Sequence, residues 1–506
     1  MADERENLPS TPHREYVAAL PDVKLGRDLM AGTRTIHAER TTYLPRFPKE
    51  SADKHKRRAE AEDVYGGLSR TISASVGMLF AKAPALSDRL VDGGADALFW
   101  ENVDLAGTDG TVFAKRFAED VIADGYGLIL VDAPNAPDDG TVTAADAERL
   151  NLRPYWRRYQ RLDVLSWRMA VVANRLQPVQ VVLREASEVE TGQYGSMARV
   201  QYRVLRLIPV VDQASGARRM VAGWAVFIED AGANGKVTVK QIAAGLYQTA
   251  TGETLDALPI ALGYGGRTDA PFTARPPLLD VAWANLYYYR KATTAAYYEE
   301  LCGFPMIHAK GRLKDAKNLP VPFEFGPSTF FETTADGDLK WVELSGSSAA
   351  IHTAALERKK RDMSDLGMSF LAGDKRAAET AKAKQLDATA ENATLSTAAT
   401  GIEDALNQAL VITARYLGVA EVNSITINRD FENVVMDAPT MLAYVTAVEK
   451  AGLPAMQLLA AWQRGGRLPE DANLEAMARD MLEAMDAKAV EAADAAERLR
   501  LGAGAV

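Results

Sequence analysis

The sequence predicts an α+β fold built from several domains. One continuous β-rich stretch lies at about 153–262, and helical segments with apolar periodicity lie on both sides of it. The length of 506 residues exceeds what one ordinary core supports, which indicates two or three domains. Apolar and charged contents of 47% and 25% are ordinary for a globular protein.

The N-terminal part predicts an arm followed by helices. Residues 1–45 read as a loop-like arm that closes on the proline-punctuated segment TTYLPRFPKES. Apolar residues recur at spacings of three and four over 56–80, which predicts one amphipathic helix. This helix begins at KHKRR (54–58), which fits a solvated helix end or a polyanion contact. Residues 115–133 predict a helix that turns at Gly125 into a buried strand.

The β-rich stretch leads to an aromatic helix. RVQYRVLRLIPVV (199–211) reads as a strand, and GWAVFIED (223–230) and KVTVKQIA (236–243) read as a hairpin joined by AGANG. Residues 276–301 then predict a helix whose stripe we assign to the core or to a subunit interface. The stripe consists of Leu279, Trp283, Leu286, Tyr287, Tyr297 and Leu301.

Short strands, two helices and an all-α tail follow. PMIHAKG, VPFEFGP and STFFETTADGDLKWVEL predict strands, with Asp336-Gly337 as a hairpin turn. Residues 350–370 predict a helix that ends near Gly367, and SITINRDF (424–431) predicts a strand. The chain from Met441 to about Arg500 is Ala- and Met-rich and predicts a helical region. Within it, GLPAMQLLAAWQRGGRLPEDANLEAMARDML reads as helix, turn, helix.

A long helix with two unlike halves lies before the last strand. DKRAAETAKAKQLDATAENAT (374–394) holds good helix formers and a single large apolar side chain, so it has almost nothing to bury. From Leu395 onward the helix gains an apolar stripe, and Gly401 predicts a bend. The polar half fits a stable surface helix, or a helix that faces a water-filled channel.

No catalytic, cofactor-binding or metal-binding residue is predicted. The five histidines include no pair at metal-ligand spacing, and neither HExxH nor a GxxxxGK[ST] phosphate loop occurs. GYGG (263–266) lacks the setting of a dinucleotide site, and LSGSSA (344–349) lacks the glycine spacing of a nucleophile elbow. Cys302 reads as a small buried thiol, and the adjacent Glu299 and Glu300 read as solvated carboxylates.

Composition excludes several classes of protein. No run approaches 18 apolar residues, which argues against a membrane span, and the polar N-terminus is not a signal peptide. A single cysteine leaves no internal disulfide and fits synthesis in a reducing cytoplasm. A net charge of −10 argues against a conventional nucleic-acid binder with a basic stripe.

Four stretches resemble the portal (head–tail connector) proteins of tailed bacteriophages. They are YLPRFPKESADKHKRRAEAEDVYGGLSRTISASVGMLFAKAP, DGDLKWVELSGSSAAIHTAALERKKRDMSDLG, ETAKAKQLDATAENATLSTAATGIEDALNQAL and TAVEKAGLPAMQLLAAWQRGGRLPED. The resemblance covers most of residues 40–485 and lies in the order and extent of the segments, because none of them is a catalytic fingerprint.

The resemblance implies a ring, usually of twelve subunits, at one capsid vertex of a virion, through which double-stranded DNA is packaged and ejected. It divides this chain into nine parts. These are an N-terminal arm (1–45), a wing (46–275), a first stem helix (276–302), a clip (303–348), a second stem helix (349–368), a tunnel loop (369–384), a spine helix with its return to the wing (385–435), a crown (436–485) and a C-terminal tail (486–506). The implied partners are the terminase large subunit, a head–tail adaptor, and the major capsid and scaffolding proteins, with no cofactor and no membrane.

Three groups of candidate residues follow from this mapping. Lys375, Arg376, Lys382 and Lys384 are candidates for transient DNA contact, or else part of a solvated mixed-charge surface. Phe323, Phe325, Phe330, Phe331 and Trp341 are candidates for the clip and adaptor interface. Trp283, Tyr287 and Tyr297 are candidates for the subunit interface. Two other readings stay open: another ring-forming adaptor or scaffold protein of a virion, and a soluble enzyme such as an NTPase.

Overall fold

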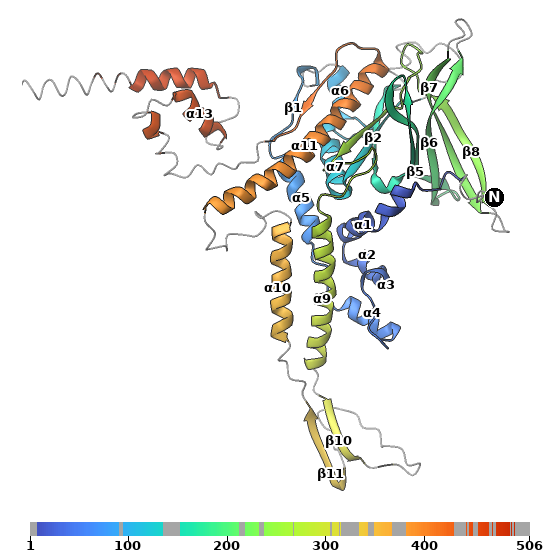
Figure 1. The fold of residues 1–506 in the computed structure, drawn as a ribbon, viewed down its shortest axis with the longest axis vertical. Helices are drawn as coiled ribbons and strands as arrows, with labels where there is room; N and C mark the ends of the chain where they lie inside the picture. Colours follow the sequence, from blue (N-terminus) through green and yellow to red (C-terminus); the bar gives the residue numbers. More distant parts are fainter. Residues whose placement is uncertain are drawn as a thin grey trace, which may run out of the picture. The chain divides into compact units, whose positions relative to one another are not determined.

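The chain divides into two compact units, Met1–Arg429 and Asp430–Val506, which are described separately (Figure 1). This computed structural model describes residues 8–90, 95–134, 152–211, 218–231, 237–266, 268–303, 306–312, 314, 333–342, 349–366 and 381–429. In the second unit it describes residues 442, 445–448, 454–464, 468, 472–485, 487 and 490.

The first 80 residues are largely helical. The helices are α1 (Arg14–Ala31), α2 (Thr33–Ala38), α3 (Arg40–Tyr43), α4 (Ala52–Glu60) and α5 (Gly67–Leu79). The prediction of a loop-like arm over 1–45 is therefore wrong. Val23, Leu25 and Ile36 are buried at irregular spacing, so burial in the folded unit, rather than a regular stripe, fixes these helices.

The single helix predicted over 56–80 is also wrong, because α4 and α5 are separated by the non-helical residues 61–66. The start of α5 depends on a distant helix. The backbone N–H of Leu68 donates to Oδ1 of Asn285 at 3.0 Å, and this bond satisfies a donor that the first helical turn leaves open. A partner 217 residues away in sequence gives no local signal.

A three-stranded antiparallel sheet forms the centre of the first unit. Its order is β3 (Tyr155–Gln160), β2 (Tyr126–Asp132), β9 (Ile260–Tyr264). The helix α7 (Gly110–Asp124) ends at Gly125, whose φ of 91° is left-handed, and the chain enters β2, which is buried at every residue. The predicted helix, turn and buried strand over 115–133 are confirmed.

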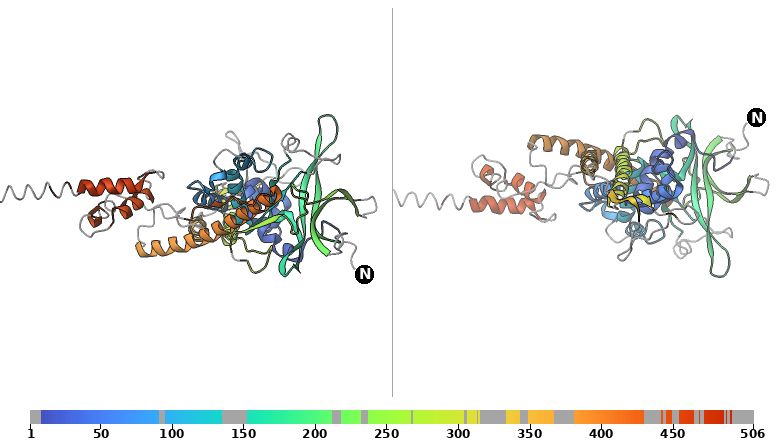
Figure 2. Two further views of the ribbon diagram at one scale, coloured as in Figure 1. Left: turned by 90° about the horizontal axis from the view of Figure 1, so that it is seen from above. Right: turned by 90° about the horizontal axis from the view of Figure 1, so that it is seen from below.

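A five-stranded antiparallel meander forms the second sheet. Its strands are β4 (Val164–Val172), β5 (Arg175–Glu190), β6 (Ser196–Val211), β7 (Arg218–Ala231) and β8 (Val237–Leu246), in that order. The predicted pairing of 223–230 with 236–243 is confirmed by the β7–β8 register. Figure 2 shows the helices of this unit on one side of the sheet, and Val200 and Val239 on its strands are exposed.

Trp156 anchors the core between the central sheet and its helices. The side chain is fully buried, and the rings of Phe99, Trp100 and Phe113 meet it edge-on with centroids 5.4–6.1 Å away. Its indole N–H donates to Oγ1 of Thr413 at 2.9 Å. Thr413 lies on α11 (Ala381–Leu417), so one side chain joins β3, α6 (Ala95–Glu101), α7 and α11.

Replacing Trp156 with Phe is expected to lower the free energy of unfolding by about 1–3 kcal/mol. The smaller ring leaves a void, and the hydroxyl of Thr413 loses a buried partner. Urea unfolding followed by circular dichroism gives the value. Trp156→Phe combined with Thr413→Val should cost less than the sum of the two single changes, because the pair shares one hydrogen bond; strict additivity would contradict this account.

Two helices and a small sheet follow the five-stranded sheet. They are α9 (Leu279–Gly303), β10 (Met306–Arg312), β11 (Thr333–Val342) and α10 (Ala349–Leu366). β10 pairs antiparallel with β11 from Met306↔Val342 to Arg312↔Thr333. The hairpin turn predicted at Asp336-Gly337 is wrong: both residues lie inside β11, at a register irregularity opposite Gly311. VPFEFGP lies outside the described residues.

The helix α11 is continuous through Gly401. Its predicted stripe is confirmed at Ile402, Leu406 and Leu410, which are buried, whereas Leu417 is 40% exposed. Gly401 serves a close approach rather than a bend: a Cβ built there would lie 2.0 Å from the backbone oxygen of Tyr264 on β9. Of the predicted strand 424–431, the described residues 424–429 form only β12 (Ile425–Thr426), paired with β1 (Ala85–Leu86).

The second unit contains a pair of helical segments. α13 (Ala455–Arg464) and the helical residues 474–485 share a small apolar cluster around Leu459 and Ala478. These segments confirm the helix, turn, helix predicted from GLPAMQLLAAWQRGGRLPEDANLEAMARDML at its two helical parts.

Candidate assembly surfaces

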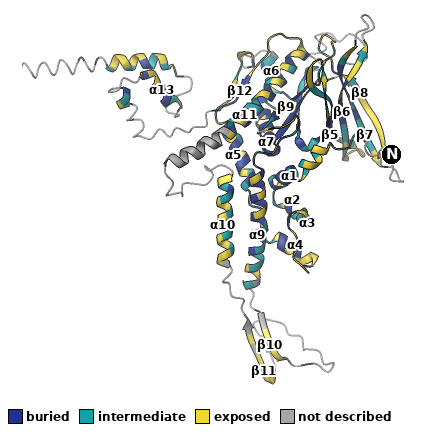
Figure 3. Ribbon diagram, in the orientation of Figure 1, coloured by how far each residue is buried: buried dark blue, intermediate teal, exposed yellow. Residues whose placement is uncertain are grey.

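The helices α9 and α10 form a stalk, in which α9 also packs against α1, α4 and α5 and α10 packs mainly against α9. They pack along one seam, in which Ala284, Tyr288 and Ala292 of α9 meet Met363 of α10. Met363 is the only buried residue among the described side chains of α10, and the remainder of that helix is half-buried or exposed (Figure 3). Helical stability comes mainly from packing, so the few buried side chains of α10 contribute little to the stability of that helix.

The aromatic stripe predicted on α9 is divided between two environments. Leu279 and Leu286 are buried, but Trp283 and Tyr287 are 46% and 44% exposed, and Tyr297 is half-buried. The core-facing aromatic residues are Tyr288 and Tyr289, which the predicted stripe omitted. The spacing of four at Ala284, Tyr288 and Ala292 was the available signal.

The two exposed aromatic side chains have defined neighbours. The indole N–H of Trp283 donates to Oδ1 of Asp22 on α1 at 3.3 Å. The ammonium groups of Lys291 and Lys359 lie 5.6 and 5.1 Å from the centroid of the Tyr287 ring. This face therefore offers amphipathic aromatic rings, a residue type enriched at protein interfaces, with two ammonium groups close to one of them.

The other candidate residues are only partly described. Lys375 and Arg376 lie outside the described residues, as do Phe323, Phe325, Phe330 and Phe331. Lys382 and Lys384 lie in the first turns of α11, which begins at Ala381, four residues before the predicted helix start at 385. Trp341 lies in β11 opposite Ile307. The described structure brings none of the predicted DNA-contact residues together with the clip residues.

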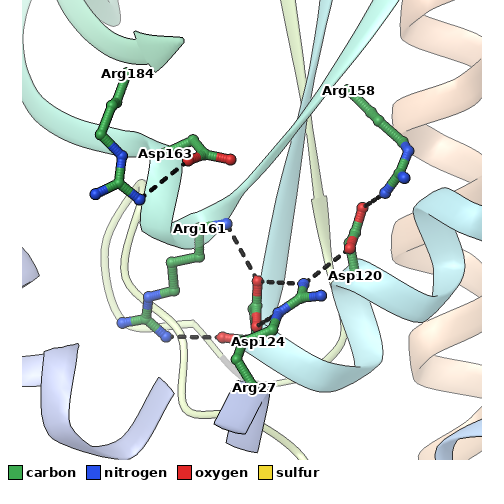
Figure 4. Close-up of polar contacts among 7 residues, drawn as sticks. All are labelled: Arg27, Asp120, Asp124, Arg158, Arg161, Asp163 and Arg184. Carbon is green, nitrogen blue, oxygen red and sulfur yellow. Dashed lines mark hydrogen bonds and ion pairs between the residues drawn. The ribbon is translucent and has the colours of Figure 1, made fainter. Parts of the chain in front are cut away.

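A buried ionic network holds α1 against α7 (Figure 4). Arg27 reaches Asp124 with Nε and Nη2 at 2.7 and 2.6 Å, and Asp120 with Nη2 at 2.8 Å. Arg158 of β3 also pairs with Asp120, and the backbone N–H of Arg161 donates to Asp124 at 3.2 Å. Burial by itself would lower the pKa of Arg27, but Asp124 and Asp120 more than offset this effect and raise the pKa.

The sequence analysis missed this network. Asp120 and Asp124 lie four residues apart on α7, on the same side as the fully buried Phe117 and Val121. Two carboxylates within an apolar helical face need a buried cation, and that pattern was the available signal.

A second network joins the two sheets. Arg203 of β6 contacts Glu185 of β5 at 2.8 Å and Asp132, at the end of β2, at 3.2 Å. Arg157 of β3 lies 3.2 Å from Glu185, and Tyr159 donates to the same carboxylate. Burial would raise the pKa of Glu185, but the charges of Arg157 and Arg203 hold it below its usual value. Every member has a structural partner, so the network fastens the sheets together.

A third ion pair fixes an exposed loop in place. Arg58 is buried and grips Glu50 with two hydrogen bonds of 2.8 and 2.9 Å, and it also donates to the carbonyl of Pro45 at 2.8 Å. The backbone N–H of Phe47 donates to Glu50 at 3.0 Å, and the guanidinium carbon lies 4.0 Å from the centroid of the Phe47 ring. We call residues 45–50 the clamped loop.

The clamp makes stability depend on pH in a defined window. The hydrogen bonds from Arg58 lower the pKa of Glu50 to about 2, so the folded state binds fewer protons there than the unfolded state. The contribution of Glu50 is therefore complete above its ordinary pKa and is lost as pH falls toward 2. The Glu50→Gln variant should have a lower free energy of unfolding than wild type at pH 7. This difference in free energy should narrow as the pH falls below about 5.

Urea unfolding at pH 7, 5, 4 and 3 measures this gap. Glu62→Gln is the control, because that exposed carboxylate has no ion pair among the described residues. A gap that stays constant with pH would contradict the assignment.

Within the described ranges, no group of three or more His, Cys, Asp or Glu side chains could hold a metal ion. In the same ranges, no helix has both the length and the apolar character needed to cross a membrane.

One family model spans the stalk and α11. A family model described as Domain of unknown function (DUF4055) matches residues 277–417, from just before α9 to the end of α11. A search of curated proteins finds no match.

Three solved structures are similar to this chain at low sequence identity. A chain of the virion of a native gene transfer agent (GTA) particle is 12% identical, with a TM-score of 0.38, over 87% of this chain and 96% of that chain. Chains from the neck of an empty GTA particle computed with C6 symmetry and of a native one computed with C12 symmetry are 13% and 11% identical, with TM-scores of 0.36 and 0.35. Each covers 81% of this chain, and 88% and 89% of the other chain respectively. At these TM-scores the likeness carries no functional argument by itself.

Proposed function

We propose that this chain is the subunit of a portal ring, the channel at one capsid vertex through which double-stranded DNA is packaged and ejected. The observation that carries the proposal is the stalk, in which α9 and α10 flank an inserted two-stranded sheet. This order of helix, strands and helix, followed by the 37-residue helix α11, is the order that the sequence resemblance implies.

The stalk needs neighbours for a physical reason. An isolated two-stranded sheet is at best marginally stable in water, and α10 has a narrow buried seam. Trp283 and Tyr287 expose large rings on the adjoining helix. Packing against copies of the same chain would cover these surfaces, and a closed ring gives every copy the same cover.

The proposal assigns the remaining partners by role. The clip around β10 and β11 would receive the terminase large subunit during packaging and a head–tail adaptor afterwards. The start of α11, with Lys382 and Lys384, would border the channel together with Lys375 and Arg376. The net charge of −10 per chain fits DNA that slides, since each phosphate bound by a cation adds affinity and would slow movement.

Native mass spectrometry and negative-stain imaging of the purified full chain test the proposal. A closed ring with a central channel and a broad outer wing is the expected result. A folded monomer at micromolar concentration would overturn the ring. A ring that binds the capsid only through a separate portal protein would identify an adaptor instead.

Replacing both Trp283 and Tyr287 with Ser is expected to shift the protein from rings to monomers. Interface aromatic residues often contribute about 2 kcal/mol or more each, so the midpoint concentration for assembly should rise at least tenfold. Analytical ultracentrifugation over a concentration series measures it. Tyr194→Ser, at a residue that is 92% exposed on the β5–β6 connection, is the matched control and should assemble as wild type.

A further inference from the structure

The clamped loop, residues 45–50, is rigid and exposed at once. Its core-facing supports are the buried Arg58–Glu50 pair and the ring of His55, whose Nε2 donates to the carbonyl of Leu44 at 2.7 Å. α9 holds the two helices that border this loop, because Arg290 donates to the carbonyl of Tyr43 on α3 at 2.6 Å and Tyr289 to that of Ala59 on α4 at 2.9 Å.

The buried Arg58–Glu50 pair carries a desolvation cost, and the residues that it orders indicate its role. Burying an ion pair loses hydration that its attraction repays only with good geometry, so such a pair is weak evidence for stability alone. Here the pair orders the five residues from Pro45 to Lys49, all of them exposed, and Lys49 has a φ of 64°, uncommon for a residue with a side chain. These five residues, which we call the tip, are therefore held in one conformation before any partner binds.

The tip has a definite chemistry. At its centre the ring of Phe47 is 46% exposed between two exposed prolines. Within residues 46–60, the five exposed cations Arg46, Lys49, Lys54, Lys56 and Arg57 outnumber the exposed carboxylates of Asp53 and Glu60. Among the described residues, only Lys56 of the five has an ion-pair partner, Glu60 at 4.0 Å. KHKRR thus combines two structural residues, His55 and Arg58, with three outward cations.

We infer that the tip docks on an acidic surface of another protein of the same particle, with Phe47 entering an apolar pocket rimmed by carboxylates. A central aromatic anchor within a polar rim is the anatomy of a protein interface, and charged rim residues select a partner of opposite charge. Duplex DNA offers phosphates to the cations but no apolar pocket to a clamped Phe–Pro tip.

A second copy of this chain fits the tip less well. The exposed aromatic face that the proposed ring would use carries Lys291 and Lys359, the same sign of charge as the tip. The inference rests on the proposed function in one respect, that the chain is a component of a multi-protein particle.

Site-specific photo-cross-linking in assembled particles tests the inference. The chain carries p-benzoylphenylalanine at position 47, or at position 194 as an exposed control, and cross-linked peptides are identified by mass spectrometry. The expected product joins position 47 to an acidic segment of a different protein. A product with this chain, a product with DNA, or no product beyond that of the control position would each overturn the inference.

Charge reversal gives the second arm. Arg46→Glu/Lys54→Glu/Arg57→Glu leaves the clamp residues untouched and should reduce the cross-link at position 47 about tenfold. Arg168→Glu/Arg175→Glu/Arg218→Glu changes three exposed cations on the five-stranded sheet and should leave it unchanged. Equal yields from the two variants would overturn the inference, as would loss of rings in the first variant alone. Ring formation by the unaltered protein is measured separately. A failure of the proposed function can therefore be distinguished from a failure of the docking inference.

Discussion

Replacing Arg27 with Met should lower the free energy of unfolding by about 3–5 kcal/mol, because the change leaves two buried carboxylates without their shared cation. Methionine keeps most of the volume, so the loss is electrostatic rather than a cavity. Chemical denaturation at pH 7 measures it. Arg168→Met, at an exposed arginine of β4, is the control and should stay within about 0.5 kcal/mol of wild type.

The cost of Arg27→Met should also shrink as the pH falls. Burial already raises the pKa of Asp124, and removing Arg27 removes the hydrogen bonds and charge that oppose this rise. The folded variant therefore binds a proton that the unfolded chain has lost, and its stability recovers toward wild type between neutral and mildly acidic pH. A cost that grows on acidification would contradict the role of Asp124.

Replacing Gly401 with Ala should destabilise the protein by about 3 kcal/mol or more, although Ala is the better helix former by about 1 kcal/mol. The added Cβ would lie 2.0 Å from the backbone oxygen of Tyr264, so α11 would have to move away from β9. The stripe residues on either side would lose contact with the sheet as it moved.

Gly77 provides the matched control for this substitution. It lies inside α5 with no heavy atom within 4 Å of a built Cβ, so Gly77→Ala should stabilise by up to about 1 kcal/mol. Thermal and urea unfolding of both variants measure the two effects. Opposite signs are expected, and a stabilising Gly401→Ala would show that the glycine is not required by close packing.

The local patterns that predicted correctly were those in which one segment carries its own signal. The strand after Gly125 is a continuous apolar run, and the β7 and β8 segments are rich in β-branched residues at a hairpin spacing. The stripe of α11 around Leu406 recurs at helical spacing. Such elements need only an apolar surface to pack against, and their secondary structure does not depend on which part of the chain provides it.

The predictions that failed depend on partners far away in sequence. Helix α1 follows from packing against α2, α7 and α9, and the break before α5 follows from the bond between Leu68 and Asn285. Asp336-Gly337 has the composition of a hairpin turn, yet it lies inside β11, because the strand pairs with β10 on both sides of it, at Thr333 and at Asp338. A turn propensity of a few tenths of a kcal/mol does not outweigh a ladder of backbone hydrogen bonds.

The sequence by itself determined the α+β class, the long two-part helix α11 and the aromatic character of α9, because periodicity and propensity are local properties. Only the tertiary structure decided which face of α9 is buried and which carboxylates form ion pairs with Arg27. It also decided that two residues of KHKRR are buried and hold the loop, while the other three are exposed. The physical reason is that a charge or a ring has no fixed role until its surroundings set the dielectric and the partners. Arg57 and Arg58 are neighbours in the chain, yet one is exposed to water and the other is buried against Glu50.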